Sequence, residues 1–200
     1  MIAIIDYGAG NIRSVYKALK FLGAECKITS DRNEILNSDK AILPGQGSFG
    51  DCMSSINNSG IRDTVLEFIK SGKDFLGICV GLQLLFEGSD ESPNTEGLGV
   101  FKGHIRKIPN GEGLKIPHMG WNSIEIKKDD KLFKGVKNGS HVYFVHSYYL
   151  DAEDKSIVSS QTDYGVKIDA SISKDNVFAT QFHPEKSGDV GMKLLGNFIN

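Results

Sequence analysis

Hydrophobic positions in the first half of the chain fall into two patterns. Short continuous apolar runs, such as Ile2–Ile5, are typical of buried strands, whereas apolar residues after Asn11 recur at helical spacing up to a helix-ending Gly23. The expected strands are Ile2–Ile5, Cys26–Ile28, Ala41–Leu43 and Phe75–Ile78, and expected helices follow Asn11, span Arg62–Lys70 and cover Leu82–Phe86. Strands separated by helices predict βαβ units and a largely parallel sheet.

The second half of the chain has a different pattern, with many strands and few helices. Several segments alternate polar and apolar residues, which is typical of antiparallel or edge strands. The expected strands are Val100–Ile108, Ser123–Ile126, His141–Tyr149, Ser156–Ser159, Ala170–Ser173 and Val177–Phe182, with a closing helix at Gly191–Ile199. We therefore predict an α/β fold: a three-layer sandwich with a central, mostly parallel sheet and antiparallel edge strands.

Length and composition narrow the function classes. The 200 residues fit one domain spanning 1–200, with no internal repeat or linker. A net charge of −2 leaves no basic excess for binding nucleic acid, and no apolar run reaches the roughly 20 residues that span a bilayer. The N-terminal residues lack the cationic region of a signal peptide. Three cysteines without a CxxC pair favour the reducing cytoplasm over a disulfide framework.

The segment most informative about chemistry is the turn Gly77-Ile78-Cys79-Val80-Gly81. It lies between a predicted strand and a helical run, and it is the cysteine counterpart of a nucleophile elbow. The flanking glycines would avoid side-chain collisions in so tight a turn, and the helix N-terminus would favour a thiolate. Cys79 is therefore a candidate nucleophile, the alternative being a buried structural cysteine. Cys26 and Cys52 are expected to be small core residues.

A cysteine nucleophile needs a base that also supplies a proton to the leaving group. The end of a predicted hairpin carries His183-Pro184-Glu185. In an extended segment His183 and Glu185 share a side, so the carboxylate could hold the imidazole toward Cys79. A surface His-Pro turn is the alternative. No group of His, Cys and carboxylate residues has metal-ligand spacing, so we expect no metal.

Pro44-Gly45-Gln46-Gly47 directly follows a predicted strand and is a candidate oxyanion loop. Glycines on both sides of Gln46 would let a peptide N–H turn toward a developing oxyanion, with the N–H of Val80 as a second donor. An ordinary turn is the alternative. The glycines after the first strand lack the full GxGxxG spacing, which argues against nucleotide binding.

Taken together, three motifs resemble the class I, or triad, glutamine amidotransferases. They are Pro44-Gly45-x-Gly47, Gly77–Leu85 and Phe182-His183-Pro184-Glu185, which occur in the family's order across most of the chain. The resemblance implies a flavodoxin-like fold and a Cys79, His183, Glu185 triad that hydrolyses L-glutamine to glutamate and ammonia without a cofactor. It further implies an oxyanion hole at Gln46 and Val80. The substrate pocket it implies comprises Gly45, Gly47, Gln83, Glu91, His146, Ser147 and Tyr148.

Within this family, Ile4–Asn11, Ile116–Asn122 and Tyr143–Tyr148 are similar to the glutaminase subunits of imidazole glycerol phosphate synthases. That similarity implies a heterodimer with a (β/α)8-barrel cyclase subunit of histidine biosynthesis. The partner interface it implies comprises Pro117, His118, Met119, Trp121 and Asn122, although this segment could equally pack in the core.

Two other functions are compatible with the same residues. The chain could be the glutaminase of another synthase, such as those of pyridoxal phosphate or anthranilate synthesis, or a non-catalytic α/β regulatory module with an unreactive Cys79. One position departs from the family pattern: Gln46 stands where a small apolar residue, often valine, is common. A polar side chain beside the loop could stabilise a different peptide orientation, and so shift the balance between the resting and active conformations of the loop.

Overall fold

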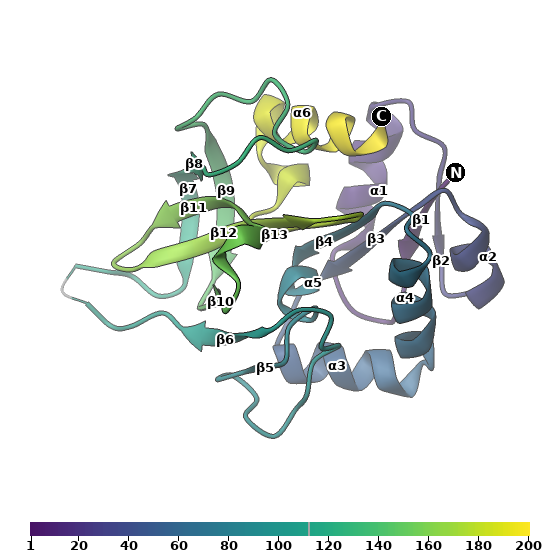
Figure 1. Cartoon of the computed structure of the whole chain (residues 1–200), viewed down its shortest axis with the longest axis horizontal. Helices are drawn as coiled ribbons and strands as arrows, with labels where there is room; N and C mark the ends of the chain where they lie inside the picture. The colour runs from purple at the N-terminus through teal and green to yellow at the C-terminus, as the bar shows by residue number, and fades with distance from the viewer. Residues whose placement is uncertain (112) are drawn as a thin grey trace.

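The computed structural model describes residues 1–111 and 113–200. Its N-terminal half, together with β13 and α6 from the C-terminal end, forms a parallel sheet with helices on both faces (Figure 1). Five strands pair in parallel in the order β2-β1-β3-β4-β13. Their bounds are β1 Ile2–Ile5, β2 Cys26–Thr29, β3 Lys40–Gly45, β4 Phe75–Cys79 and β13 Val177–Thr180. Nearly all of their residues are buried, which explains the continuous apolar runs in the sequence.

Helices cover this sheet in two layers. Figure 1 shows α1 (Ile12–Phe21) and α6 (Gly188–Ile199) on one face, and α3 (Phe49–Asn58) and α4 (Ile61–Lys70) on the other. The short α2 (Arg32–Asn37) packs against α4. Asn11 stands at the N-cap of α1 as expected, but its side chain makes no capping hydrogen bond to the backbone and accepts from Ser14 instead. The predicted core cysteines, Cys26 in β2 and Cys52 in α3, are both buried.

The sheet continues from β13 into antiparallel strands. β12 (Lys167–Lys174) pairs antiparallel with β13 and with β10 (Tyr148–Ala152), which in turn pairs with β6 (Gly103–Lys107). The short β5 (Gly88–Ser89) ends this path, while β11 (Val158–Asp163) joins β12 to β8 (Glu125–Ile126). The predicted fold class, a mostly parallel sheet with antiparallel strands on one side, is confirmed.

A separate ribbon of two strands lies beside the main sheet. β7 (His118–Ser123) and β9 (His141–His146) pair antiparallel along their whole length. The expected single strand His141–Tyr149 is therefore wrong: it breaks at Ser147, so that β9 belongs to the ribbon and β10 to the main sheet. The expected strand at Ser156–Ser159 begins instead with a 3-10 turn at Lys155–Ile157.

The predicted helix Leu82–Phe86 is also wrong in its bounds. The helix α5 is a single turn, Val80–Gln83, directly after Cys79. It stops because the following carbonyls accept hydrogen bonds from another segment: Leu84 from Leu98, Leu85 from Val100 and Phe86 from Gly99. Carbonyls engaged in this way are not free for the i+4 amides of a longer helix.

Candidate active site

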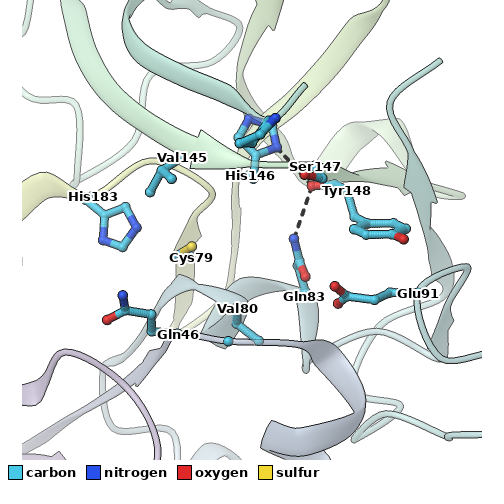
Figure 2. Close-up of a pocket in the computed structure, with 12 residues that line it drawn as sticks. Gln46, Cys79, Val80, Gln83, Glu91, Val145, His146, Ser147, Tyr148 and His183 are labelled. Atoms are coloured by element: carbon cyan, nitrogen blue, oxygen red, sulfur yellow. Dashed lines mark hydrogen bonds between the residues drawn. The ribbon is translucent and has the colours of Figure 1, made fainter. Parts of the chain in front are cut away.

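Cys79 lies at the carboxyl end of β4, in the middle of the parallel sheet. Its φ of +57° and ψ of −111° place it in a backbone conformation that residues with a side chain rarely adopt. Such strain in a sharp strand-to-helix turn is the feature expected of a nucleophile elbow. Cys79 is buried and lines a cavity, whose other lining residues surround it in Figure 2.

The two glycines flanking Cys79 make this turn possible. A Cβ added to Gly81 would lie 2.0 Å from the carbonyl oxygen of Leu43, and one added to Gly77 would lie 2.7 Å from that of Gly81. Both contacts are with backbone oxygens, one in the turn and one in the neighbouring β3. Neither oxygen can move away without shifting the backbone. The prediction that these two glycines avoid side-chain collisions in the turn is therefore confirmed.

His183 and Glu185 form a buried hydrogen-bonded pair. Nδ1 of His183 lies 2.8 Å from Oε1 of Glu185, with side-chain exposures of 3% and 1%. The segment is not extended as expected: His183 starts a 3-10 turn, Pro184–Lys186, in which the N–H of Lys186 donates to the His183 carbonyl. The turn brings the carboxylate back onto the imidazole.

Protonation of His183 is favoured by its partners. Burial lowers the pKa of His183, but interactions with Cys79 and Glu185, through hydrogen bonding and charge, outweigh it and raise the pKa to about 9. At neutral pH the imidazole is therefore held as a cation between a thiol group and a carboxylate. Such a group can deliver a proton to a departing amine.

A cavity of about 250 Å³ opens beside Cys79 and His183. Figure 2 shows Gln46 and His183 on one side of Cys79, with Gln83 and Glu91 on the other. The segment Val145–Tyr148, at the break between β9 and β10, forms a further wall. Most of the predicted site residues meet here: Gln46, Gly47, Cys79, Val80, Gln83, Glu91, His146, Ser147, Tyr148 and His183. Gly45 ends β3 beside Cys79 in the strand register, and Pro117 also reaches the cavity.

Glu91 is fixed by the start of helix α3. Its Oε2 accepts a hydrogen bond from the backbone N–H of Phe49 at 2.7 Å, and the neighbouring Ser92 hydroxyl accepts from Gly50. Backbone donors at a helix N-terminus favour a negatively charged partner. The carboxylate therefore lines the cavity in a defined orientation.

Gln181 is a site residue that the sequence reasoning missed. Its side chain is fully buried, accepts from Gln83 Nε2 at 3.0 Å and directs its own Nε2 at the Cys79 sulfur, 3.9 Å away. Gln83 Nε2 also donates to the carbonyl of Tyr148 at 3.2 Å. The alternation argument that pairs His183 with Glu185 places Gln181 on the same side, so a signal for it was present.

His146, in the cavity wall, forms a hydrogen-bonded pair of imidazoles with His118. His146 Nδ1 lies 2.9 Å from the Tyr148 carbonyl, so it carries the hydrogen, and its Nε2 accepts from His118 Nδ1 at 2.9 Å. The remaining nitrogen of His118 faces the amide nitrogen of Asn122 at 3.3 Å. Burial lowers the pKa of His118 to about 4 and, foremost among its causes, that of His146 to about 3, so both rings are neutral.

The five predicted interface residues lie in β7 or directly before it, and they point to two different faces. Pro117, Met119 and Trp121 are exposed, Met119 by 67% and Trp121 by 57%. His118 is buried and stacked between Phe144 and Tyr164, and the half-exposed Asn122 contacts it through its amide nitrogen. The exposed apolar patch, here defined as Pro117, Met119 and Trp121, is therefore narrower than the predicted set.

Within residues 1–111 and 113–200, no group of three or more His, Cys, Asp or Glu side chains has the arrangement of a metal site. Across the same residues, every helix is too short or too polar to cross a membrane.

Comparison with known proteins identifies the family. The family model described as "Glutamine amidotransferase class-I" matches residues 3–200. The chain belongs to the class I glutamine amidotransferases. As a member of that family it is an enzyme, and the elbow cysteine with its imidazole and carboxylate lies in the fold typical of these amidotransferases.

Relatives within the amidotransferase family are similar over their whole length. Imidazole glycerol phosphate synthase subunit HisH of Caldanaerobacter subterraneus subsp. tengcongensis is 54% identical, covering 99% of this chain and 97% of the relative. The protein of the same name from Methanocaldococcus jannaschii is 48% identical, covering 100% and 98%.

Solved structures support the fold alone. PurLQS from Thermotoga maritima aligns with a TM-score of 0.77 at 23% identity, over 100% of this chain and 97% of that chain. A glutamine amidotransferase from the same organism aligns with a TM-score of 0.64 at 16% identity, covering 97% and 79%. The amidotransferase fold is thus shared well beyond the range of close sequence similarity.

Proposed function

We propose that this chain is the glutaminase subunit of an imidazole glycerol phosphate synthase. The observation that carries the proposal is His183, hydrogen-bonded to the buried Glu185, at the cavity where Cys79 lies on its strained turn. Full-length relatives named as that subunit, 46–54% identical, support it.

The reaction is hydrolysis of the glutamine side chain through a thioester. The Cys79 thiolate attacks the carboxamide carbon, and the oxyanion that forms accepts hydrogen bonds from the N–H groups of Gln46 and Val80. Each such donor contributes about 3 kcal/mol to the transition state. His183 protonates the nitrogen as the C–N bond breaks and ammonia leaves. It then takes a proton from water, which attacks the thioester and releases glutamate and the thiolate.

Substrate recognition falls to the other cavity residues. The cavity of about 250 Å³ is smaller than the roughly 300–1,000 Å³ of pockets for drug-sized ligands, as suits a single amino acid. Glu91 supplies a carboxylate for the α-ammonium group of glutamine. Gly45, Gly47, Gln83 and the His146–Tyr148 backbone and side chains complete the pocket.

Ammonia must reach a second enzyme before water protonates it. We assign the exposed apolar patch of Pro117, Met119 and Trp121 to docking of a (β/α)8-barrel cyclase subunit, in a heterodimer. His118 and Asn122 would support that interface from behind. The cyclase would use ammonia to form imidazole glycerol phosphate and aminoimidazole carboxamide ribotide, in histidine synthesis. Three free thiols, one of them the nucleophile, suit the reducing cytoplasm.

The test is glutamate release by the chain together with its cyclase and the nucleotide ligand of that cyclase. Cys79→Ala is expected to abolish release, and a glutamine-mimicking electrophile is expected to label Cys79 in the wild type. Activity that persists in Cys79→Ala would exclude the triad. An unreactive Cys79 would favour a regulatory module, and co-purification with a different synthase would reassign the partner.

A further inference from the structure

Two buried hydrogen-bond donors beneath the oxyanion loop have no part in the mechanism above. The hydroxyl of Tyr7, just after β1, donates to the carbonyl of Pro44 at 2.9 Å. The thiol of Cys52, in helix α3, donates to the carbonyl of Gln46 at 3.5 Å. The exposed fractions are 3% for Tyr7 and 0% for Cys52, and neither residue lines the cavity.

Both groups keep their hydrogen at physiological pH. Burial is the largest cause that raises the pKa of Tyr7, and the charges of Cys52 and Cys79 add to it. Burial likewise raises the pKa of Cys52. A phenol and a thiol that stay protonated can donate to the two loop carbonyls throughout the working pH range.

Anchoring a carbonyl also fixes the N–H of the same peptide unit. In a planar trans peptide the C=O and N–H point to opposite sides. The Pro44 carbonyl bound to Tyr7 therefore fixes the direction of the Gly45 N–H, and the Gln46 carbonyl bound to Cys52 directs the Gly47 N–H away from α3. Gly47 has a φ of +109°. Because glycine adopts positive and negative φ about equally readily, its backbone does not by itself hold the loop in this conformation.

The two contacts flank the loop that offers hydrogen-bond donors to the oxyanion. Their supports come from different elements, one at the end of β1 and one on α3, so they fix the loop at two points along its length. We propose that Tyr7 and Cys52 are positioning residues for glutamine hydrolysis: they hold the peptide units on both sides of the Gly45–Gln46 peptide, so that the Gln46 N–H meets the oxyanion. This proposal rests on the proposed function.

Tyr7→Phe removes only the hydroxyl and is the sharpest test. In the complex with the ligand-bound cyclase, we expect kcat for glutamate release to fall about tenfold. That is less than the 10²–10³-fold loss on deleting an oxyanion donor, because the donor stays and only its placement is relaxed. KM is expected to stay within twofold, since the glutamine contacts are intact. Cys52→Ala is expected to act in the same direction.

A second measurement separates loop placement from damage to the nucleophile. Iodoacetamide alkylates a thiolate by direct displacement, with no oxyanion. Its rate at Cys79, followed by mass spectrometry, is expected to be unchanged within twofold in Tyr7→Phe. Cys26→Ala is the matched control for Cys52→Ala, because it truncates another buried cysteine, one in β2. It should leave kcat within twofold of wild type.

Two outcomes would overturn the positioning role. One is an active wild-type complex in which Tyr7→Phe retains kcat within twofold. The other is a fall in alkylation equal to the fall in kcat, which would locate the defect at the thiolate. A wild-type complex that releases no glutamate, while Cys79 still reacts with iodoacetamide, would instead overturn the proposed function itself.

Discussion

Glu185 Oε1 lies 2.8 Å from His183 Nδ1, and both side chains are almost completely removed from water. The second carboxylate oxygen, Oε2, is buried and has no hydrogen-bond partner among the residues that the structure describes. The negative charge is therefore compensated chiefly by the imidazole, which makes this a strongly directional pair. Breaking it by removing one member leaves the other buried and unpaired.

Glu185→Gln is expected to lower kcat about 10²-fold, less than the loss in Cys79→Ala. The amide oxygen can still accept from Nδ1, so the ring orientation survives, but the charge that helps to raise the pKa of His183 is gone. The alkaline limb of the kcat–pH profile should consequently move to lower pH. Steady-state glutamate release between pH 6 and 10 measures both effects. A loss equal to that of Cys79→Ala would assign Glu185 a more direct role.

The stability of the fold should also depend on His183. Its pKa is about 9 in the folded state and about 6.5 in an unfolded chain, so the folded state binds the proton more tightly. The resulting stabilisation is complete below pH 6.5 and disappears as the pH rises through 9. Relative to His183→Gln, wild type should lose up to about 3 kcal/mol between pH 6 and 10. Urea unfolding at each pH tests this, and a pH-independent difference would contradict it.

His118 and His146 should have the opposite effect in acid. Their pKa values are lowered to about 4 and about 3, so the unfolded chain binds more protons than the folded one below pH 6.5. Stability should therefore fall as the pH drops from 6.5 toward 4, by up to about 3 kcal/mol for His118 alone. His118→Gln should show a shallower acid dependence in the same urea experiment. Equal slopes for the two proteins would show that His118 protonates freely in the folded state.

Gly81→Ala should destabilise the fold by about 3 kcal/mol or more, because its Cβ would lie 2.0 Å from the Leu43 carbonyl oxygen. Gly196→Ala in helix α6 is the matched control, since its Cβ meets no atom within 4 Å. That change should leave stability unchanged or raise it by about 1 kcal/mol through helix propensity. Chemical denaturation compares them, and similar stabilities would refute the steric account of the turn.

Trp121→Ala should weaken binding to the cyclase at least tenfold, because a large exposed aromatic ring at an interface is a typical hot spot. Phe21→Ala is the control: Phe21 is 81% exposed, but on helix α1, away from the patch. Its effect on the Kd from titration calorimetry should be less than twofold. If both substitutions weaken binding equally, the docking surface is not the patch on β7.

How much could be predicted from the sequence differs between the two halves of the chain. The strands around Cys79 are buried on both faces, so their apolar runs mark them directly, and the motifs at their carboxyl ends locate the cavity. β7 escaped prediction because its apolar residues Met119 and Trp121 face outward, which inverts the usual pattern. The end of α5 was missed because hydrogen bonds from residues near Leu98 stop it, and local sequence carries no sign of them.

The site shows the same division. Most residues in contiguous motifs were found. The contacts of Gln181 and Tyr7 join segments that lie far apart in the sequence, and the Cys52 contact, which spans only six positions, depends on how α3 packs against the loop. Gln181 contacts Cys79 across 102 positions, a relationship that only the folded sheet creates.

The strand break at Ser147 separates the main sheet, which bears the nucleophile, from the ribbon β7–β9, which forms a sheet of its own. The outer face of that ribbon can change without altering the strands that set the reaction geometry. An ammonia-generating domain of this design could therefore be redirected to a new acceptor enzyme by replacing a handful of outward-facing side chains. A protein engineer would exchange only the outward-facing residues of the ribbon, because Val145 and His146 of β9 line the cavity and Tyr143 accepts a hydrogen bond from the His183 N–H.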